Sequence, residues 1–369
     1  MELCIGGNIK RLRRQKGITQ EALADQLHIS AAAVSKWERN ETLPDIGMVI
    51  PLASYFGVST DEVLGLDAAK NDERIRDYLE ESGRLAALGR SEERFDLIAR
   101  AYEEFPNDWR IVEAYMWQLN YDPRCTDKCG NDVHKEELYR LCDRVLDDCP
   151  VEKTRYAALS ILGGLYLADG EKEKALETAR CFPDYFMTEG EELQHSFEPG
   201  SAEWLGQIHE NIFDLTSLLL VKIRDCALNT PDTAPREQIK YLEKAVSLIR
   251  LIFDDGDYGF YNADLSDLYL WIANRYVMAD DPASALRNYE LSFSHARAYD
   301  ALPEKTRHTS FLVRGKLFDK SRTNSDDEKN MVARQIGALR SFGVCDKIMD
   351  TDGMKELMRR YEPLMGKRE

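Results

Sequence analysis

The sequence has 369 residues, and its 49 Lys and Arg stand against 66 Asp and Glu, a formal net charge of −17. Hydrophobic residues make up 43% and charged residues 31%, with 12 prolines, which excludes a disordered or low-complexity chain and favours a helix-rich globular protein. The sequence contains no run of about 18 apolar residues and no signal-peptide core at its start, so we expect a cytoplasmic protein without a membrane span. Its eight cysteines are then expected to be mostly thiols.

The charge is unevenly distributed along the chain. Residues 1–66 hold 7 of the basic and 8 of the acidic residues, so this segment has a net charge of −1 and the remainder carries −16. Five of the seven basic residues lie in KRLRRQK, residues 10–16. A local basic cluster can dock phosphates even in an acidic chain, although a solvated helix face is the alternative explanation.

The first 66 residues predict five short helices. Apolar residues at helical spacing indicate a helix over 5–16 that ends at Gly17, and the remaining helices are marked by capping residues. These signals are Thr19 before QEALADQL, Ser30 before AAAVSKWER and Asn40 after it, Pro44-Asp45 before the fourth helix, and the capping-box pair Ser59 and Glu62 at the fifth.

Between the second and third predicted helices lies a turn at His28-Ile29, preceded by the small residue Ala24, which allows a close helix crossing. With ITQEALADQL, VSKWER and LPD, the segment from Ile5 to Leu66 closely resembles the DNA-binding domain of the Cro/phage-repressor (XRE) family. The resemblance covers about a sixth of the chain. It implies a five-helix, lambda-repressor-like domain that binds double-stranded DNA.

The resemblance also implies a role for each matching position. In this motif the second helix crosses the DNA backbone and the third enters the major groove. Base edges are assigned to Ala31, Ala32 and Lys36, and phosphate contacts to Gln20, Ser35, Arg39 and Asn40. Arg13 and Glu38 match an internal ion pair, which leaves Arg11, Arg14 and Lys16 as the other candidates for DNA contact. The helical position of Trp37 predicts a core residue.

The sequence departs from the family pattern in three places, which involve four residues. Ala31 and Ala32 replace longer polar side chains, so direct base reading depends largely on Lys36, and one good contact contributes about 1–3 kcal/mol of discrimination. His28 occupies a turn position usually filled by Gly, which requires a positive φ. Pro51 falls inside the fourth predicted helix, which is therefore expected to be kinked or to start late.

The rest of the chain is predicted to be helical, with a linker and connecting helix over 67–90, a boundary near 65–72, and a helical sensor and dimerisation domain over 91–369. No strand-like alternation stands out. The expected loops are 120–132, 188–201, 229–237, 254–259 and 320–328. The fold class is thus all-α.

Segments 159–179 and 269–289 share small and aromatic residues at matching positions and resemble the tetratricopeptide helical hairpin; an irregular helical bundle is the alternative. An XRE domain followed by such repeats resembles the bacterial peptide-pheromone regulators of the Rgg/PlcR/PrgX group. That resemblance implies a homodimer that binds a short signalling peptide through asparagines on inner helices. Asn211 and Asn274 are the candidates, and a structural asparagine is the alternative for each.

Cys125 and Cys129 form one close pair, with His134, Cys142 and Cys149 nearby. Zinc sites prefer two close ligand pairs, so we expect thiols here and no metal or other cofactor. No phosphate loop, HExxH or GxSxG motif is present, and we expect no enzymatic activity. Two hypotheses follow: a ligand-sensing transcriptional regulator, or a helical protein-interaction scaffold with a weak or vestigial DNA-binding head.

Overall fold

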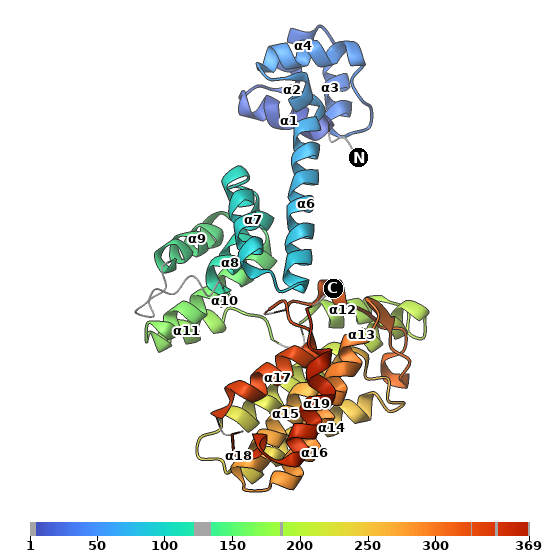
Figure 1. The fold of residues 1–369 in the computed structure, drawn as a ribbon. Helices are drawn as coiled ribbons and strands as arrows, with labels where there is room; N and C mark the ends of the chain where they lie inside the picture. The colour runs from blue at the N-terminus through green and yellow to red at the C-terminus, as the bar shows by residue number, and fades with distance from the viewer. Residues whose placement is uncertain (1–4, 122–133, 185–186, 326, 344–345, 368–369) are drawn as a thin grey trace. The chain divides into compact units, whose positions relative to one another are not determined.

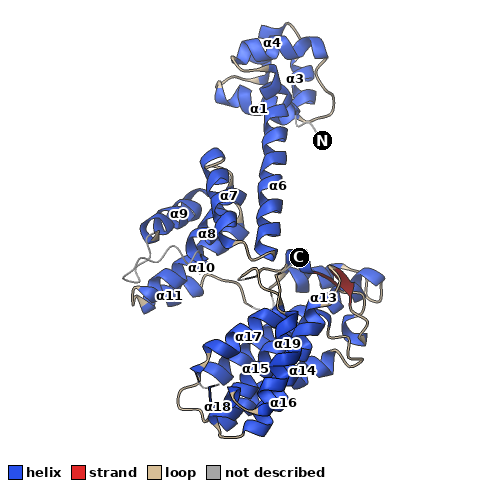
Figure 2. Ribbon diagram, in the orientation of Figure 1, coloured by secondary structure: helices blue, strands red, loops and turns tan. Residues whose placement is uncertain are grey.

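The computed structural model describes residues 5–121, 134–184, 187–325, 327–343 and 346–367 (Figure 1). The chain divides into two compact units, residues 1–81 with 97–114 and residues 82–96 with 115–369. Regular structure in the described ranges is helical except for two strands of three residues each (Figure 2). The predicted all-α class, with a small five-helix domain followed by a helical array, is confirmed.

The N-terminal domain contains the five predicted helices. Thr19, Ser30 and Ser59 each accept a hydrogen bond from the backbone N–H three residues further on, at 3.0–3.2 Å, as expected for N-caps. These bonds fix where the second, third and fifth helices begin. The helices are α1 (Ile5–Gln15), α2 (Gln20–Leu27), α3 (Ala31–Glu38), α4 (Ile46–Phe56) and α5 (Thr60–Leu64).

The expected left-handed backbone positions are present. His28 has φ 54° and Asn40 has φ 58°, and both follow the end of a helix. The expectation of a late start for α4 is wrong. Asp45 caps the helix by accepting from the N–H of Gly47 at 2.8 Å, and α4 then continues past Pro51 to Phe56.

A small apolar core joins these helices. Gly6 of α1 allows the closest approach, because a Cβ at this position would lie 1.9 Å from the carbonyl oxygen of Trp37. The Gly6 N–H donates to Asn40 Oδ1 at 3.2 Å, so the end of α3 is bonded directly to α1. The fully buried side chains include those of Ile9, Leu23, Val34, Leu52 and Val63.

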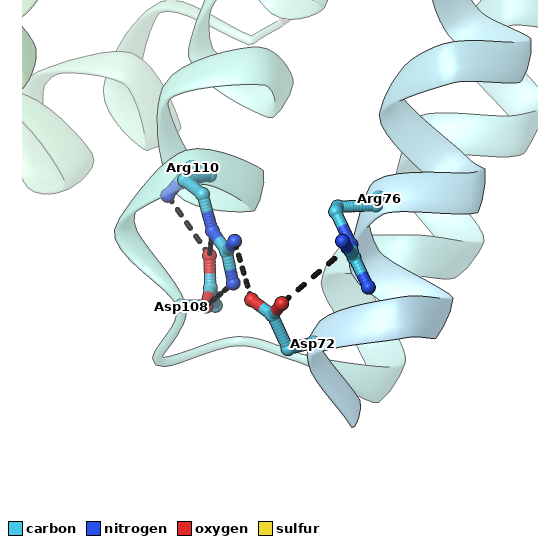
Figure 3. A network of polar contacts seen from close by, with 4 residues as sticks. All are labelled: Asp72, Arg76, Asp108 and Arg110. Atoms are coloured by element: carbon cyan, nitrogen blue, oxygen red, sulfur yellow. Dashed lines mark hydrogen bonds and ion pairs between the residues drawn. The ribbon is translucent and has the colours of Figure 1, made fainter. Parts of the chain in front are cut away.

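A long helix, α6 (Leu66–Ala87), covers the boundary expected near 65–72 and most of the linker and connecting helix expected over 67–90. It is followed by α7 (Ser91–Glu104) and α8 (Trp109–Tyr121). Asp72 of α6 accepts from Arg110 at 2.7 Å and pairs with Arg76 at 3.6 Å, while Asp108 also binds Arg110 at 2.9 Å (Figure 3). These pairs lie near the surface, so they orient the start of α8 against α6 more than they stabilise it.

The second unit contains the predicted helical hairpins. α10 packs on α11 and α15 packs on α16, which matches the segments 159–179 and 269–289. Ala273 and Ala285 are fully buried where α15 and α16 meet. The helices of this part are α9 (Lys135–Asp148), α10 (Glu152–Ala168), α11 (Lys172–Ala179), α12 (Glu189–Ser196), α13 (Ala202–Asn229), α14 (Pro235–Ile252), α15 (Asn262–Met278) and α16 (Pro282–Asp300).

Two details of the second unit differ from the sequence prediction. The expected loop 188–201 contains α12, which begins after the N-cap Thr188. The chain after α16 forms an antiparallel pair, β1 (Lys305–Arg307) and β2 (Leu317–Asp319), with Thr306 opposite Phe318. The chain then continues into α17 (Met331–Ser341), α18 (Asp346–Met349) and α19 (Asp352–Tyr361).

Two apolar clusters of the second unit, both within residues 220–361 as described, meet along α15. One contains Phe253 and Tyr261 and draws mainly on α13, α14 and α15. The other contains Tyr289 and Phe293 and draws mainly on α15, α16, α17 and α19. Because α15 contributes to both clusters, this part of the array has a continuous core. Within the residues described, no helix is both long and apolar enough to cross a membrane.

Candidate nucleic-acid interface

The pair α2 and α3 forms a helix-turn-helix. α2 ends at Leu27, His28 reverses the chain in the left-handed conformation, and Ser30 begins α3 after two intervening residues. The N–H of Ile29 donates to the carbonyl of Ala24 at 3.0 Å, which completes the end of α2. A histidine therefore takes the turn position without a change in the motif.

The two faces of α3 differ sharply. Val34 and Trp37 point into the core, with 0% and 7% of their surface exposed. Residues 32, 35, 36 and 39 lie on the opposite side of the helix. Of these, Ala32, Lys36 and Arg39 are exposed. The side chains assigned to DNA contact at 31, 32, 35, 36 and 39 thus share a single face of α3.

Lys36 is the long polar side chain among the three positions assigned to base reading. It is exposed, and none of the hydrogen bonds or ion pairs found among the described residues involves it. Ala31 is half-buried and Ala32 exposed, and each offers only a methyl group. Direct hydrogen bonding to a base from these three positions therefore rests on Lys36.

Arg39 and Ser35 form a small polar group with a residue that the sequence reasoning missed. Arg39 donates to both carboxylate oxygens of Glu41, at 2.7 and 3.1 Å, and to Ser35 Oγ at 3.0 Å. The hydrogen bond from Arg39 lowers the pKa of the Glu41 carboxyl. The spacing of two residues between opposite charges was the signal available in the sequence.

Glu38 is the buried acceptor that holds the domain together beneath α3. Arg13 donates to its two carboxylate oxygens at 2.5 and 2.9 Å, and Gln20 Nε2 donates to it at 2.8 Å. Burial raises the pKa of Glu38, but the hydrogen bonds from Arg13 and Gln20 outweigh it and the pKa lies below its ordinary value. The two residues that the resemblance pairs are thus in contact.

Some assigned phosphate contacts have internal partners in this structure. Gln20 donates to Glu38, and Asn40 accepts from Gly6, so both side chains take part in joining helices. Lys16 is directed at α4, where its ammonium group contacts the carbonyl of Tyr55 and lies 4.2 Å from that ring's centroid. Lys16 and Asn40 therefore take part in helix packing, and their contact with DNA stays a prediction.

Of the other basic residues in α1, Arg11 and Arg14 lie on the surface. Arg11 pairs with Glu62 of α5 at 3.2 Å. Arg14 is exposed, and the described residues include no hydrogen-bonding partner for its guanidinium group. Of the three α1 residues assigned to DNA contact, Arg14 is therefore the most available for a phosphate.

The two asparagines assigned to ligand binding have structural partners. Asn274 is 1% exposed and accepts from the Tyr289 hydroxyl at 2.7 Å. Asn211 donates to the carbonyl of Gly190 at 3.2 Å and to Gln194 at 3.0 Å, which joins α13 to α12. Both amides join helices, which fits the structural alternative, and ligand binding by these residues stays a prediction.

The cysteines considered for a zinc site are only partly within the described residues. Cys125 and Cys129 lie outside the described residues. Cys142 and Cys149 are buried free thiols, and burial raises the pKa of Cys142 to about 12. Among the described residues, no group of three or more histidine, cysteine or acidic side chains could hold a metal ion.

Comparison with known sequences places the helix-turn-helix in a family. Residues 9–63 match the family described as helix-turn-helix (HTH_3). The chain is 39% identical over 56 residues to the HTH-type transcriptional activator BcrR of Enterococcus faecalis, covering 15% of this chain and 28% of that protein. It is 34% identical over 65 residues to the HTH-type transcriptional regulator ImmR of Bacillus subtilis, covering 18% of this chain and 51% of ImmR.

Solved structures with longer alignments are more distant. Bacillus thuringiensis PlcR, in complex with the peptide PapR7 and DNA, aligns with 79% of this chain and 95% of its own at 15% identity and a TM-score of 0.34. ComR of S. thermophilus, in complex with DNA and its signalling peptide ComS, aligns with 80% of this chain and 94% of its own at 15% identity and a TM-score of 0.29.

The uncharacterized HTH-type transcriptional regulator y4dJ of Sinorhizobium fredii is 36% identical over 64 residues, which cover 17% of this chain and 83% of y4dJ. The chain thus spans most of this relative, but only about a quarter to a half of BcrR and ImmR. Through its N-terminal domain, the chain therefore belongs to the family of HTH-type transcriptional regulators.

Proposed function

We propose that this protein is a cytoplasmic transcriptional regulator that binds double-stranded DNA through residues 1–66. Residues 67–90 form the connection, and residues 91–369 form a helical domain that dimerises and senses a short signalling peptide. The observation that carries the DNA-binding part is the exposed polar face of α3, formed on a buried framework of Val34 and Trp37. In a helix-turn-helix, this face enters the major groove.

Family membership and the contacts within the domain support this assignment. BcrR and ImmR are described as a transcriptional activator and a transcriptional regulator. In this proposal Lys36, which is exposed, contacts base edges, and Ser35, Arg39 and Arg14 bind phosphates. Gln20 retains a second amide hydrogen for a phosphate while its other one donates to Glu38.

Specificity is expected to come from two half-sites rather than one. Each α3 offers one long polar side chain to the bases, and the neighbouring alanines contribute contact only with thymine methyl groups. A homodimer doubles the reading surface and adds a dependence on the spacing and shape of the DNA between half-sites. Dimerisation is therefore part of the proposal.

The sensing part rests on the helical hairpins of the second unit and on the sequence resemblance of the array to peptide-pheromone regulators. Stacked helical hairpins form extended surfaces that bind peptides and proteins. A peptide that binds one arrangement of the dimer more tightly than another shifts the population towards it, and with it the spacing of the two α3 helices. The proposal includes no catalytic step.

The test is selection of bound fragments from the source genome by the purified full-length protein at two salt concentrations. Recovery of a paired site, with affinity falling steeply as salt rises, supports a specific regulator that contacts phosphates. Recovery of unrelated fragments alone, with and without added peptide extract, would reject sequence-specific binding and favour the scaffold hypothesis.

A further inference from the structure

A cavity of about 730 Å³ lies in the second unit at the end of α6. Its size is within the range of about 300–1,000 Å³ that is typical of small-ligand pockets. It is lined by Arg84 and Ala87 of α6 and Leu88 after it, by Tyr299 and Asp300 of α16 and Leu302 and Glu304 after it, and by Lys320, Ser321, Asn330, Gly366 and Lys367.

One wall of the cavity is formed by the C-terminal segment 364–367, which we name the C-terminal strap. Asn330 N–H donates to the carbonyl of Gly366 at 2.9 Å, and Gly366 N–H donates back to Asn330 Oδ1 at 3.1 Å. Asn330 Nδ2 also donates to the carbonyl of Leu364 at 2.9 Å. Asn330 thus forms three hydrogen bonds with the backbone of the strap.

The chain just before Asn330 is in turn attached to the end of α6. Ser325 N–H donates to the carbonyl of Ala86 at 2.9 Å. Gly89, with φ 69°, allows Asp327 to approach so closely that a Cβ would lie 2.0 Å from the Asp327 carbonyl oxygen. The end of α6 therefore contacts the segment 325–330, and Asn330 of this segment is hydrogen-bonded to the strap.

Glu328 connects the strap with the residues that follow α6. Its carboxylate binds Lys367 at 2.5 Å and lies 3.9 Å from Arg90. The hydrogen bond from Lys367, followed by its positive charge, lowers the pKa of Glu328. Lys367 is thus linked through Glu328 to Arg90, which follows α6 in the chain. A ligand that contacts Lys367 would act on this linked group.

The inner surface of the cavity is held by hydrogen bonds and carries both signs of charge. Asp300 accepts from the N–H groups of Met331 and Val332 at 2.8 and 3.0 Å. Lys320 donates to the carbonyl of Leu302 at 2.7 Å and lies 5.1 Å from the ring centroid of Tyr299. The buried Tyr299 ring and Leu302 provide an apolar floor between these charges.

The rim adds a second set of opposite charges. Arg84 and Lys367 are exposed on the side of α6 and the strap, and Glu304 is exposed on the side of α16. A guanidinium and an ammonium group suit a carboxylate, and a carboxylate suits an ammonium group. Lys320, which contacts the carbonyls of Asp300 and Leu302, adds a further positive charge. Charges of both signs beside an apolar floor match a molecule with two charged ends and an apolar middle.

We propose that this cavity binds a short unblocked peptide, with its carboxylate towards Arg84 and Lys367 and its amino group towards Glu304 and Asp300. This inference rests on the proposed sensing function and names its site, away from Asn211 and Asn274. A bound peptide bridges α6, α16 and the strap, so it tightens the attachment of α6 to the array.

The experiment uses the full-length protein and an equimolar mixture of unblocked tetrapeptides, with the same mixture N-acetylated and C-amidated as the comparison. Retained peptides are identified by affinity-selection mass spectrometry, and hydrogen exchange is followed over residues 82–88. The variants are Arg84→Gln and Glu304→Gln, and Lys355→Gln on the exposed side of α19 is the control. Thermal unfolding checks that each variant folds.

We expect retention of a subset of unblocked peptides, slower exchange over residues 82–88, and an at least ten-fold loss of affinity in each cavity variant but not in Lys355→Gln. Equal retention of blocked peptides, or unchanged affinity in both cavity variants, would overturn the site. Absence of any retained peptide would overturn it as well. Fragment selection without peptide tests DNA binding separately, so failure of one proposal leaves the other measurable.

Discussion

Glu41 holds the guanidinium of Arg39 with two hydrogen bonds of 2.7 and 3.1 Å. Both side chains are at least half exposed, so a DNA phosphate can compete for the same guanidinium group. The Glu41 carboxylate therefore competes with a DNA phosphate for Arg39. Binding of Arg39 to a phosphate requires the loss of this pair.

Glu41→Gln is therefore expected to strengthen DNA binding a few-fold, by about the same factor for all sequences, because phosphate contacts carry no base information. The measurement is fluorescence anisotropy with a selected site and an unrelated duplex at several salt concentrations. Glu103→Gln in α7 makes the same change in net charge as a control. An equal gain in the control would assign the effect to overall charge rather than to Arg39.

Lys36→Ala is expected to flatten the preference among DNA sequences by about 1–3 kcal/mol, since Lys36 supplies the long side chain of the reading face. Arg39→Ala is expected to weaken binding to all sequences alike and to reduce the salt slope by about 1. Competition binding against a panel of single-base variants separates the two. An unchanged preference in Lys36→Ala would remove Lys36 from its assigned role.

Arg13→Met is expected to destabilise the N-terminal domain by about 3–5 kcal/mol at neutral pH, because it leaves the Glu38 carboxylate buried without its partner. The wild-type pKa of Glu38 is lowered from 4.5. Its contribution to stability is thus present above pH 4.5 and is lost as the pH falls through the lower, folded pKa.

The penalty of Arg13→Met should accordingly shrink below pH 4.5, where Glu38 is protonated in the unfolded chain. Urea unfolding from pH 3 to 7, followed by the fluorescence of Trp37 in a variant lacking the other tryptophans, measures this. The double variant Arg13→Met, Glu38→Met should recover much of the loss at pH 7. A pH-independent penalty would show that packing, not the unpaired carboxylate, causes the loss.

A second pH dependence is expected from Asp264 in α15. Burial, followed by the negative charge of Asp267, raises the pKa of Asp264 to about 7 from an ordinary value of 3.8. The folded protein therefore binds an extra proton between these values, and the contribution of this group to stability falls as the pH rises from about 4 to 7.

Asp264→Asn removes the buried charge, so we expect it to raise the free energy of unfolding at pH 8 and to change it little at pH 4. Chemical denaturation at the two pH values measures the difference. Asp254→Asn, at an exposed position in the neighbouring turn, is the matched control. A stabilisation that is the same at both pH values would argue against a buried carboxylate at this position.

The parts of the fold that the sequence predicts correctly are those governed by local rules. Thr19, Ser30 and Ser59 start helices because a side-chain oxygen satisfies an N–H group nearby in sequence. His28 and Asn40 follow helix ends because their side chains tolerate a positive φ. The two tetratricopeptide-like hairpins are also visible, because small residues recur where paired helices approach.

The parts that it misses depend on contacts between distant residues. Lys16 and Asn40 match DNA-contacting positions, but their partners, Tyr55 and Gly6, lie in other helices. Asn274 accepts a hydrogen bond from Tyr289, which lies fifteen residues away in the next helix, and helical spacing alone does not reveal this contact. The cavity at the strap is formed by residues from 84 to 367, and no local pattern brings these segments together.

The division of α3 into a buried and an exposed face has a consequence for how this regulator changes over time. Val34 and Trp37 carry the stability of the domain, whereas substitutions at Ala32 and Lys36 touch no core residue. The reading positions can therefore vary with little effect on folding, and a new operator can be acquired by few mutations. The exposed Ala32 can be replaced by a longer side chain without entering the core, which makes this domain a favourable starting point for redesigned DNA recognition.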